Sequence, residues 1–202
     1  MKKITIINTG CANISSVRFA FERLGVKVNV SDNVDEIRGA DRLILPGVGA
    51  APAAMKSIEA KQLKMCIQSL CQPVLGVCLG MQLMVKESQE NDLGNAATTP
   101  CLNLMDGQVK RMQVGDLRLP HMGWNEVTSV YDNPLFKGID DKTHFYFVHS
   151  FALEQYANTL ATCDYGMRFS AAIHKDNFYG VQFHPERSSD AGAQLLSNFL
   201  NI

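Results

Sequence analysis

A cysteine between two glycines is the first candidate for chemistry in this sequence. Cys78 follows the apolar run at residues 74–77, and Gly76 and Gly80 flank it at Gly-x-Cys-x-Gly spacing. In the equivalent serine motif the glycines let the chain turn sharply from strand to helix and leave the central side chain exposed above a sheet. A helix beginning near Leu79 would turn free N–H groups toward the sulfur and favour the nucleophilic thiolate. The same spacing also fits a glycine-rich turn that merely holds a small buried cysteine.

A histidine and a glutamate lie over a hundred positions further along. His184 and Glu186 follow the run at residues 179–183, with Pro185 between them. Residues two apart in an extended chain point the same way, and the proline keeps this segment from continuing as a helix. A base beside a carboxylate that orients it is what a cysteine nucleophile needs. Taken alone, the pair also fits a histidine at a strand end with an incidental glutamate neighbour.

The elements that must position these residues alternate between strand and helix. We expect strands at residues 3–7, 26–30, 42–45 and 74–77, and helices from Asn13 or Ser15 to about Leu24 and at residues 34–39, 50–70 and 79–87. This order predicts an α/β fold with a flavodoxin-like, open, mostly parallel sheet and helices on both faces. The site would lie at the carboxyl ends of the strands, where distant residues meet.

The second half of the chain has a different pattern. A polar stretch at residues 89–100 predicts a surface loop. Strand-like runs follow at residues 102–105, 108–113, 126–130, 145–149, 159–163, 170–174 and 178–183, and a last helix is expected at 189–200. We expect these strands to join the same sheet in antiparallel fashion, so that residues 1–202 form one domain.

Composition narrows the class of protein. Nineteen Lys and Arg residues balance 20 Asp and Glu residues, so no basic excess predicts a nucleic-acid or membrane surface. The N-terminal apolar run is too short for a signal peptide, and none approaches a membrane span of about 20 residues. No metal-ligand spacing occurs, so we predict no metal and no cofactor. The cysteines show no disulfide framework, which predicts a cytoplasmic protein in which five thiols are core fillers: Cys11, Cys66, Cys71, Cys101 and Cys163.

Together, the cysteine motif and the late His-Pro-Glu triplet resemble the class I (triad) glutamine amidotransferase family over essentially the whole chain. Four stretches are similar to one branch of that family, the glutaminase subunits of imidazole glycerol phosphate synthases. They are Pro-Gly-Val-Gly at 46–49, Pro-His-Met-Gly-Trp-Asn at 120–125, Phe-Tyr-Phe-Val-His-Ser at 145–150 and His-Pro-Glu-Arg-Ser at 184–188. Because the sequence ends one helix after the triplet, we expect no fused ammonia-consuming domain.

The resemblance implies that the chain hydrolyses glutamine to glutamate and ammonia. The Cys78 thiolate would attack the side-chain amide, His184 would move the proton, and Glu186 would hold the imidazole. The oxyanion would be stabilised by the backbone N–H of Leu79 and by a second donor from the loop at residues 46–49, which must reorient first. Within that loop the implied residues are Val48 and Gly49. The implied substrate-binding residues are Gln82, His149, Ser150 and Phe151.

The resemblance also implies a partner, a separate (β/α)₈-barrel cyclase that forms a heterodimer with this chain. The cyclase would use the ammonia to make imidazole glycerol phosphate and an aminoimidazole carboxamide ribotide in histidine biosynthesis. Arg187 stands where many relatives are expected to have lysine, and residues 8–13 and 91–101 depart from the family pattern. The implied interface residues are Met122, Trp124, Asn125, Tyr146 and Arg187.

Other interpretations compete with this one. The chain could feed ammonia to a different synthetase, for pyridoxal phosphate, purines or anthranilate, although residues 120–125 argue against it. It could be a cysteine hydrolase acting on another amide, or a catalytically silent regulatory subunit. Gln82 could be a solvent-facing helix residue, and Trp124 could be a core residue.

Overall fold

The computed structural model describes residues 2–10, 13–91 and 97–202. Cys11 and residues 92–96 of the expected loop therefore lie outside the described residues. In these ranges, no helix is long and apolar enough to cross a bilayer. In chain order the elements are β1 (Ile4–Ile7), α1 (Ile14–Arg23), β2 (Val28–Ser31), α2 (Val34–Arg38), β3 (Arg42–Gly47), α3 (Ala51–Ala60), α4 (Lys64–Gln68), β4 (Val74–Cys78), α5 (Leu79–Gln82), β5 (Glu87–Ser88), β6 (Thr99–Pro100), β7 (Gln108–Arg111), β8 (His121–Ser129), η1 (Pro134–Phe136), β9 (Thr143–His149), β10 (Phe151–Leu153), β11 (Thr159–Asp164), β12 (Arg168–Lys175), β13 (Phe178–Val181), η2 (Pro185–Arg187) and α6 (Ser189–Asn201).

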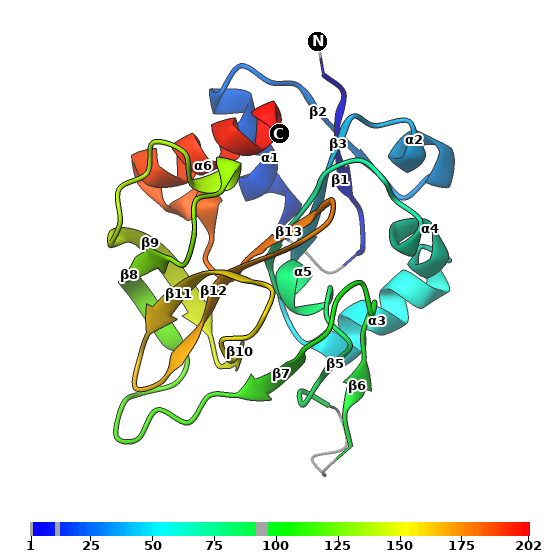
Figure 1. The fold of residues 1–202 in the computed structure, drawn as a ribbon. Coiled ribbons are helices and arrows are strands. Elements are labelled where there is room, and N and C mark those ends of the chain that lie inside the picture. The colour runs from blue at the N-terminus through cyan, green and yellow to red at the C-terminus, as the bar shows by residue number, and fades with distance from the viewer. Residues whose placement is uncertain (1, 11–12, 92–96) are drawn as a thin grey trace.

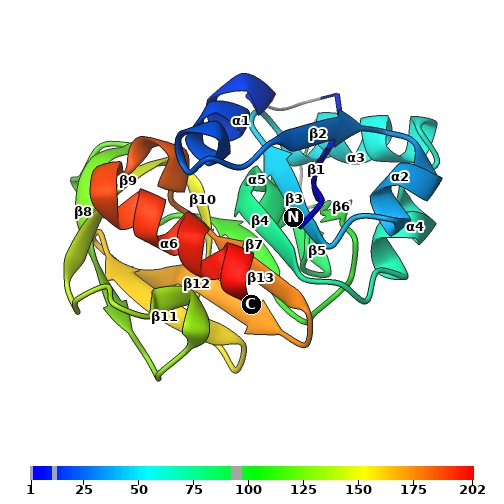
Figure 2. The same cartoon turned by 90° about the horizontal axis from the view of Figure 1, so that it is seen from above.

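One central sheet joins the two halves of the chain (Figure 1 and Figure 2). Over the described residues its nine strands run in the order β2-β1-β3-β4-β13-β12-β11-β8-β9. Pairing is parallel from β2 to β13 and antiparallel from β13 to β9. Because β13 lies directly beside β4, the carboxyl ends of these two parallel strands meet at one edge. The predicted meeting of Cys78 with the residues after β13 follows from this topology.

Helices cover both faces of the sheet, as predicted. Along β3, Ile44 packs in the cluster that includes α1 and α6. Leu43 and Leu45 pack in the other cluster, with α2, α3, α4 and α5. This alternation is the period of two that a strand imposes on its side chains. Figure 1 shows α1 and α6 on one side of the strands and α3 and α4 on the other.

Three expected elements differ in the structure. The helix expected at residues 50–70 is two helices, and Gln62, which lies between them, has a left-handed φ of 56°. The helix after Cys78 ends at Gln82 instead of near residue 87, and residues 102–105 form no strand. The last two differences share a cause. The carbonyls of residues 83–86 accept hydrogen bonds from the N–H groups of residues 101–105, so neither segment completes its own regular structure.

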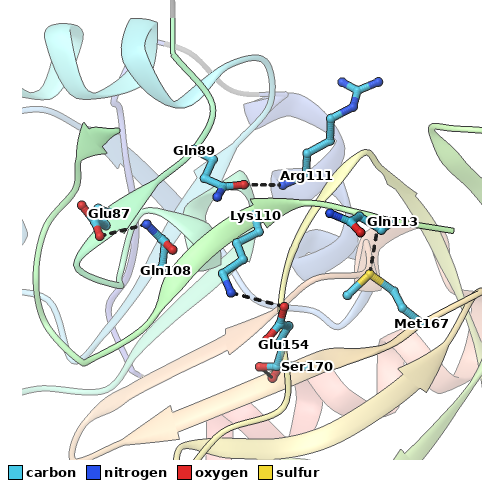
Figure 3. A network of polar contacts seen from close by, with 9 residues as sticks. All are labelled: Glu87, Gln89, Gln108, Lys110, Arg111, Gln113, Glu154, Met167 and Ser170. Atoms are coloured by element: carbon cyan, nitrogen blue, oxygen red, sulfur yellow. Dashed lines mark hydrogen bonds and ion pairs between the residues drawn. The ribbon is translucent and has the colours of Figure 1, made fainter. Parts of the chain in front are cut away.

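The later strands do not all join the central sheet, because β10, β7, β5 and β6 form a second, small sheet. Figure 3 shows how polar side chains hold it. Gln108 donates to Glu87 at 3.0 Å, and Lys110 pairs with Glu154 at 3.3 Å. The hydroxyl of Ser170, on β12, donates to the carbonyl of Glu154 at 2.9 Å. Glu154 directly follows β10, so its contact with Ser170 ties this edge strand of the small sheet to β12 of the central sheet.

The turn from β4 into α5 leaves no room for side chains at two glycines. A Cβ on Gly80 would lie 1.8 Å from the carbonyl oxygen of Leu45, and one on Gly76 would lie 2.8 Å from the carbonyl oxygen of Gly80. Between them, Cys78 has φ 53° and ψ −112°, outside the regions that most residues adopt. The predicted sharp strand-to-helix turn is confirmed, and close backbone packing makes both glycines necessary.

Two buried histidines join the ends of β8 and β9. Asn125 Nδ2 donates to the carbonyl of Asp164 at 3.0 Å, and the same amide nitrogen lies 3.3 Å from His121 Nε2. His121 Nε2 is therefore the acceptor, and His121 Nδ1 donates to His149 Nε2 at 3.0 Å. His149 Nδ1 in turn donates to the carbonyl of Phe151 at 2.9 Å. Burial lowers the pKa of His121 to about 4 and that of His149 to about 3, so both rings are neutral.

The close approach at Gly80 predicts a large loss of stability in Gly80→Ala. The added methyl group would collide with the Leu45 carbonyl, so we expect a loss of more than about 3 kcal/mol or failure to fold. Gly138→Ala is the matched control, because Gly138 has φ 72° but open space at its Cβ. That variant should lose about 1–2 kcal/mol, the cost of a left-handed alanine. Urea unfolding of both variants checks this, and equal losses would contradict it.

The histidine pair predicts acid sensitivity. Below pH about 6.5 the unfolded chain protonates histidines that the folded chain keeps neutral, so the free energy of unfolding falls with pH down to about pH 4. The double variant His121→Gln, His149→Gln takes up no protons at these positions. Its stability should change less steeply with pH, by up to about 1.4 kcal/mol per pH unit for each histidine. Urea unfolding from pH 7 to 4.5 measures both slopes, and parallel slopes would contradict the prediction.

Candidate active site

The sulfur of Cys78 lies in a closed setting. The residue is 8% exposed, so the expectation that its side chain stands exposed above the sheet is wrong. Cys78 lines a cavity together with residues 148–151 and the segment after β13. The helix that follows has only four residues, so it offers the sulfur a short stack of peptide dipoles. A hydrogen-bond donor from outside this helix lies near the sulfur, because Gln182 Nε2 is 3.8 Å from Cys78 Sγ.

His184 and Glu186 form a buried pair beside the cysteine. His184 Nδ1 lies 2.8 Å from Glu186 Oε1, and the two side chains are 7% and 3% exposed. Glu186 is in the 3₁₀ turn η2, so the predicted pairing is present although the chain is not extended there. Nε2 of His184 has no hydrogen-bond partner among the described residues. Burial lowers the pKa of His184, but Cys78 and Glu186 outweigh it and raise the pKa to about 10.

A ring of hydrogen bonds fixes the backbone of His184. Its N–H donates to the carbonyl of Tyr146 at 2.9 Å. The N–H of Tyr146 donates to Ser188 Oγ at 3.0 Å, and that hydroxyl donates to the carbonyl of His184 at 2.7 Å. On the opposite side of the chain, Phe183 is fully buried and stacks on Phe145 at 4.1 Å between centroids. Strand β9 and the core thus hold the imidazole in place.

The three residues of the predicted triad line one cavity of about 490 Å³. A cavity of about 540 Å³ lies near η1, but it holds none of the predicted site residues. In the ranges that the structure describes, no three side chains of metal-ligating type converge. The residues lining the active-site cavity are Asn13, Val48, Gly49, Cys78, Leu79, Gln82, Glu90, Arg111, Pro120, Val148, His149, Ser150, Phe151, His184, Glu186 and Arg187.

The residues predicted to stabilise an oxyanion lie on two walls of this cavity. Leu79 is the first residue of α5, where an N–H has no partner within the helix. Val48 and Gly49 follow β3; Val48 is 40% exposed, and Gly49 has φ 97°. A Cβ on Gly49 would meet nothing within 4 Å, so the loop has space around it.

Some hydrogen-bonding groups of the predicted substrate-binding residues are already bonded to one another. Gln82 is 5% exposed, so the solvent-facing alternative is wrong. Its Nε2 donates to the carbonyl of Phe151 at 2.9 Å and to Gln182 Oε1 at 2.8 Å, which leaves its own carbonyl oxygen for a ligand. The carbonyl of Ser150 accepts from the N–H of Met112. His149, Ser150 and Phe151 all line the cavity, but the carbonyls of Ser150 and Phe151 already accept hydrogen bonds within the protein.

The predicted interface residues lie on β8, β9 and η2, and one of them, Arg187, also lines the cavity. Met122 and Trp124 are 62% and 52% exposed, so the core alternative for Trp124 is wrong. Trp124 meets Tyr146 edge to face at 6.2 Å, and the Arg187 guanidinium lies 5.9 Å from the Tyr146 ring centroid. Asn125 differs from the other four predicted interface residues, because its side-chain amide is already hydrogen-bonded to His121 and to the carbonyl of Asp164.

Several residues of the site were not predicted from the sequence. Gln182 and Ser188 bond to the triad, and Glu90 and Arg111 line the cavity. Gln182 could have been found, because it is a polar residue in an otherwise apolar strand end, two positions before His184. Figure 3 shows the Arg111 side chain pointing away from the contacts that its backbone makes with Gln89. No pattern in the sequence marks Glu90 or Arg111.

The expectation that Cys71 fills the core is wrong. This residue is exposed, whereas Cys66, Cys101 and Cys163 are buried as core fillers. Burial raises the pKa of the Cys101 and Cys163 thiols to about 12. These two thiols are therefore poor nucleophiles.

Comparison with known proteins agrees with the geometry. The family described as "Glutamine amidotransferase class-I" matches residues 5–202. Imidazole glycerol phosphate synthase subunit HisH 1 of Vibrio vulnificus is 53% identical over 201 residues, which are 100% of this chain and 98% of that relative. The subunit HisH of Pasteurella multocida is 54% identical over 200 residues, 99% of this chain and 98% of that relative.

Solved structures show the same fold at low identity. The crystal structure of a glutamine amidotransferase has a TM-score of 0.73 at 17% identity, and the match covers 98% of this chain and 97% of the other. PurLQS from Thermotoga maritima has a TM-score of 0.71 at 18% identity, with 100% and 99% covered. The family match and the two close relatives carry the assignment, and the family resemblance seen in the sequence is confirmed. This chain belongs to the class-I glutamine amidotransferase family and is a glutamine amidotransferase.

Proposed function

We propose that the chain hydrolyses glutamine through Cys78, His184 and Glu186 and delivers the ammonia to a separate cyclase subunit. The observation that carries the proposal is the shared cavity. It brings a sulfur and an imidazole together from over a hundred positions apart, with Glu186 Oε1 2.8 Å behind the ring at Nδ1. The imidazole nitrogen Nε2, which has no partner among the described residues, is the one left to exchange protons.

The chemistry follows from this arrangement. Cys78 Sγ attacks the carboxamide carbon of glutamine, and the carbonyl oxygen becomes an oxyanion. His184 Nε2 donates its proton to the amide nitrogen, the C–N bond breaks, and ammonia leaves. A water molecule then gives a proton back to His184 and attacks the thioester, which releases glutamate and the thiolate. Glu186 stabilises the imidazolium, in line with the raised pKa of His184.

The oxyanion needs two donors in this proposal. The N–H of Leu79 is one, and the loop at Val48 and Gly49 supplies the other after it reorients. Glycine at φ 97° and open space around Gly49 make such a change inexpensive.

The cavity walls suit an amino-acid substrate. Glu90 and Arg111 both line it, and their opposite charges match the ammonium and carboxylate that glutamine carries on its α-carbon. The carbonyl oxygen of Gln82 and the segment at residues 149–151 complete the contacts to the rest of the molecule.

The partner in this proposal is the (β/α)₈-barrel cyclase of imidazole glycerol phosphate synthase. Two relatives that match nearly the whole chain are named as subunits of that synthase. Met122 on β8 pairs with Val148 on β9, which lines the cavity. A partner docked on the exposed side chains of these two strands would receive ammonia without loss to solvent. Aromatic anchors with a nearby arginine are typical of the centre of an interface.

Removal of the nucleophile tests the activity. Cys78→Ala should lower glutamate release from glutamine by at least about 10³-fold, because no other group can form the thioester. Cys71→Ala is the control: it removes an exposed thiol outside the cavity and should retain the wild-type rate. Both are measured with the cyclase and its nucleotide ligand present, and melting curves confirm folding. Undiminished turnover in Cys78→Ala would favour the silent-subunit interpretation.

Removal of exposed side chains tests the interface. Met122→Ala with Trp124→Ala should weaken binding to the cyclase at least about tenfold, because it deletes two apolar anchors. Met65→Ala removes a methionine that is 81% exposed on α4 and should leave the affinity unchanged. Titration calorimetry measures the dissociation constants. Equal affinity of all three proteins would place the interface elsewhere.

A further inference from the structure

A glutamine side chain reaches the sulfur from the segment after β13, which also carries the catalytic histidine. Gln182 is fully buried, and its Nε2 lies 3.8 Å from Cys78 Sγ. Gln182 and His184 are two positions apart in the segment that follows β13, which bends at residues 182 and 183. Gln182 reaches the sulfur and His184 lines the same cavity as Cys78, while Phe183 is buried and stacks on Phe145. Cys78 thus meets two groups from one short segment.

The orientation of the Gln182 amide is determined by its neighbours. The carbonyl of Phe151 can only accept, so the group of Gln82 that faces it at 2.9 Å must be the NH₂. The second hydrogen of that NH₂ points to Gln182 at 2.8 Å, so the Gln182 atom there must be the oxygen. The Gln182 NH₂ is then the group that faces the sulfur. A fixed carbonyl at one end thus sets a donor at the other.

We propose that Gln182 is a positioning residue that donates a hydrogen bond to the Cys78 thiolate and holds it ready for attack. This inference rests on the proposed glutaminase activity. A thiolate only 8% exposed has lost most of its hydration, so a protein donor has to replace water. The four-residue helix α5 contributes little of this, and His184 has to give up its proton during the reaction. The amide of Gln182 keeps both hydrogens throughout and supplies a constant donor.

The pH profile of Cys78 alkylation tests this role without using glutamine. Iodoacetamide labelling of the full-length chain, read by mass spectrometry at the peptide that contains Cys78, reports the thiolate fraction. Gln182→Met keeps the volume and removes the donor, so the midpoint of the profile should rise by about one pH unit. Gln182→Glu keeps the shape, accepts from Gln82 and adds a negative charge, so its midpoint should rise further.

The control is Asn198→Leu. It removes another buried amide, which donates to the carbonyls of Leu135 and Lys137 outside the cavity, and its midpoint should not move. The other titratable groups that line the cavity are unchanged in every variant, so a displaced profile reports on position 182. They are His149, His184, Glu90, Glu186, Arg111 and Arg187.

Each outcome decides the inference. A raised midpoint in a folded Gln182 variant supports it, and a wild-type midpoint overturns it. If neither variant folds, the side-chain amide resonances of Gln182 in the unaltered chain decide: they should shift as Cys78 ionises, and fixed resonances would overturn the role. Glutamine turnover is measured separately, with kcat expected to fall about tenfold and KM unchanged. A shifted midpoint in a chain without glutaminase activity would uphold this inference while rejecting the proposed function.

Discussion

The backbone of Gly80 lies against the carbonyl of Leu45, and the placement of the nucleophile depends on this contact. Because Gly80 has no side chain, α5 can pack directly on β3. This packing holds Cys78, the residue before α5, in its unusual backbone conformation. Cys78 therefore stands at the carboxyl end of β4, between β3 and β13, with Gly47 as its partner on β3. The strain at Cys78 persists because the packing around it leaves no alternative.

A second constraint is the need to satisfy polar groups in a buried place. The carbonyl of Phe151 accepts from both His149 and Gln82. Through these bonds it sets the tautomer of one ring and the orientation of two amides. The polar wall of the cavity is thus a single connected arrangement in which each group has one permitted direction. Such an arrangement costs little desolvation when it is complete and much when one member is missing.

The sequence carried the local signals of this fold and lacked the non-local ones. Apolar periodicity and the glycine spacing around Cys78 were enough to predict the parallel half and the elbow. The triad was predicted from the family resemblance of the cysteine motif and the His-Pro-Glu triplet taken together. The early end of α5 was not visible, because residues 83–86 have an apolar pattern that suits a helix, and only their bonds to residues 101–105 redirect them. Gln62 interrupts a helix without the glycine or proline that usually marks an interruption. The small sheet escaped for the same reason, since two-residue strands are defined by their partners and not by their own pattern. Gln182, by contrast, could have been predicted, because it is a polar residue among apolar neighbours and lies two positions before His184.

The ring of hydrogen bonds among Tyr146, Ser188 and His184 ties the imidazole to a strand of the antiparallel half, whereas the sulfur belongs to the parallel half. The distance between them thus records how the two halves are aligned. A slip of one residue moves a strand by about 3.3 Å and turns its side chains to the other face. A molecule that had folded with such a shift in strand register could have normal helix content and a well-packed core and still be catalytically inactive. In this architecture, catalytic activity reports that the strands are paired in their native register, which spectroscopic measures of compactness do not report.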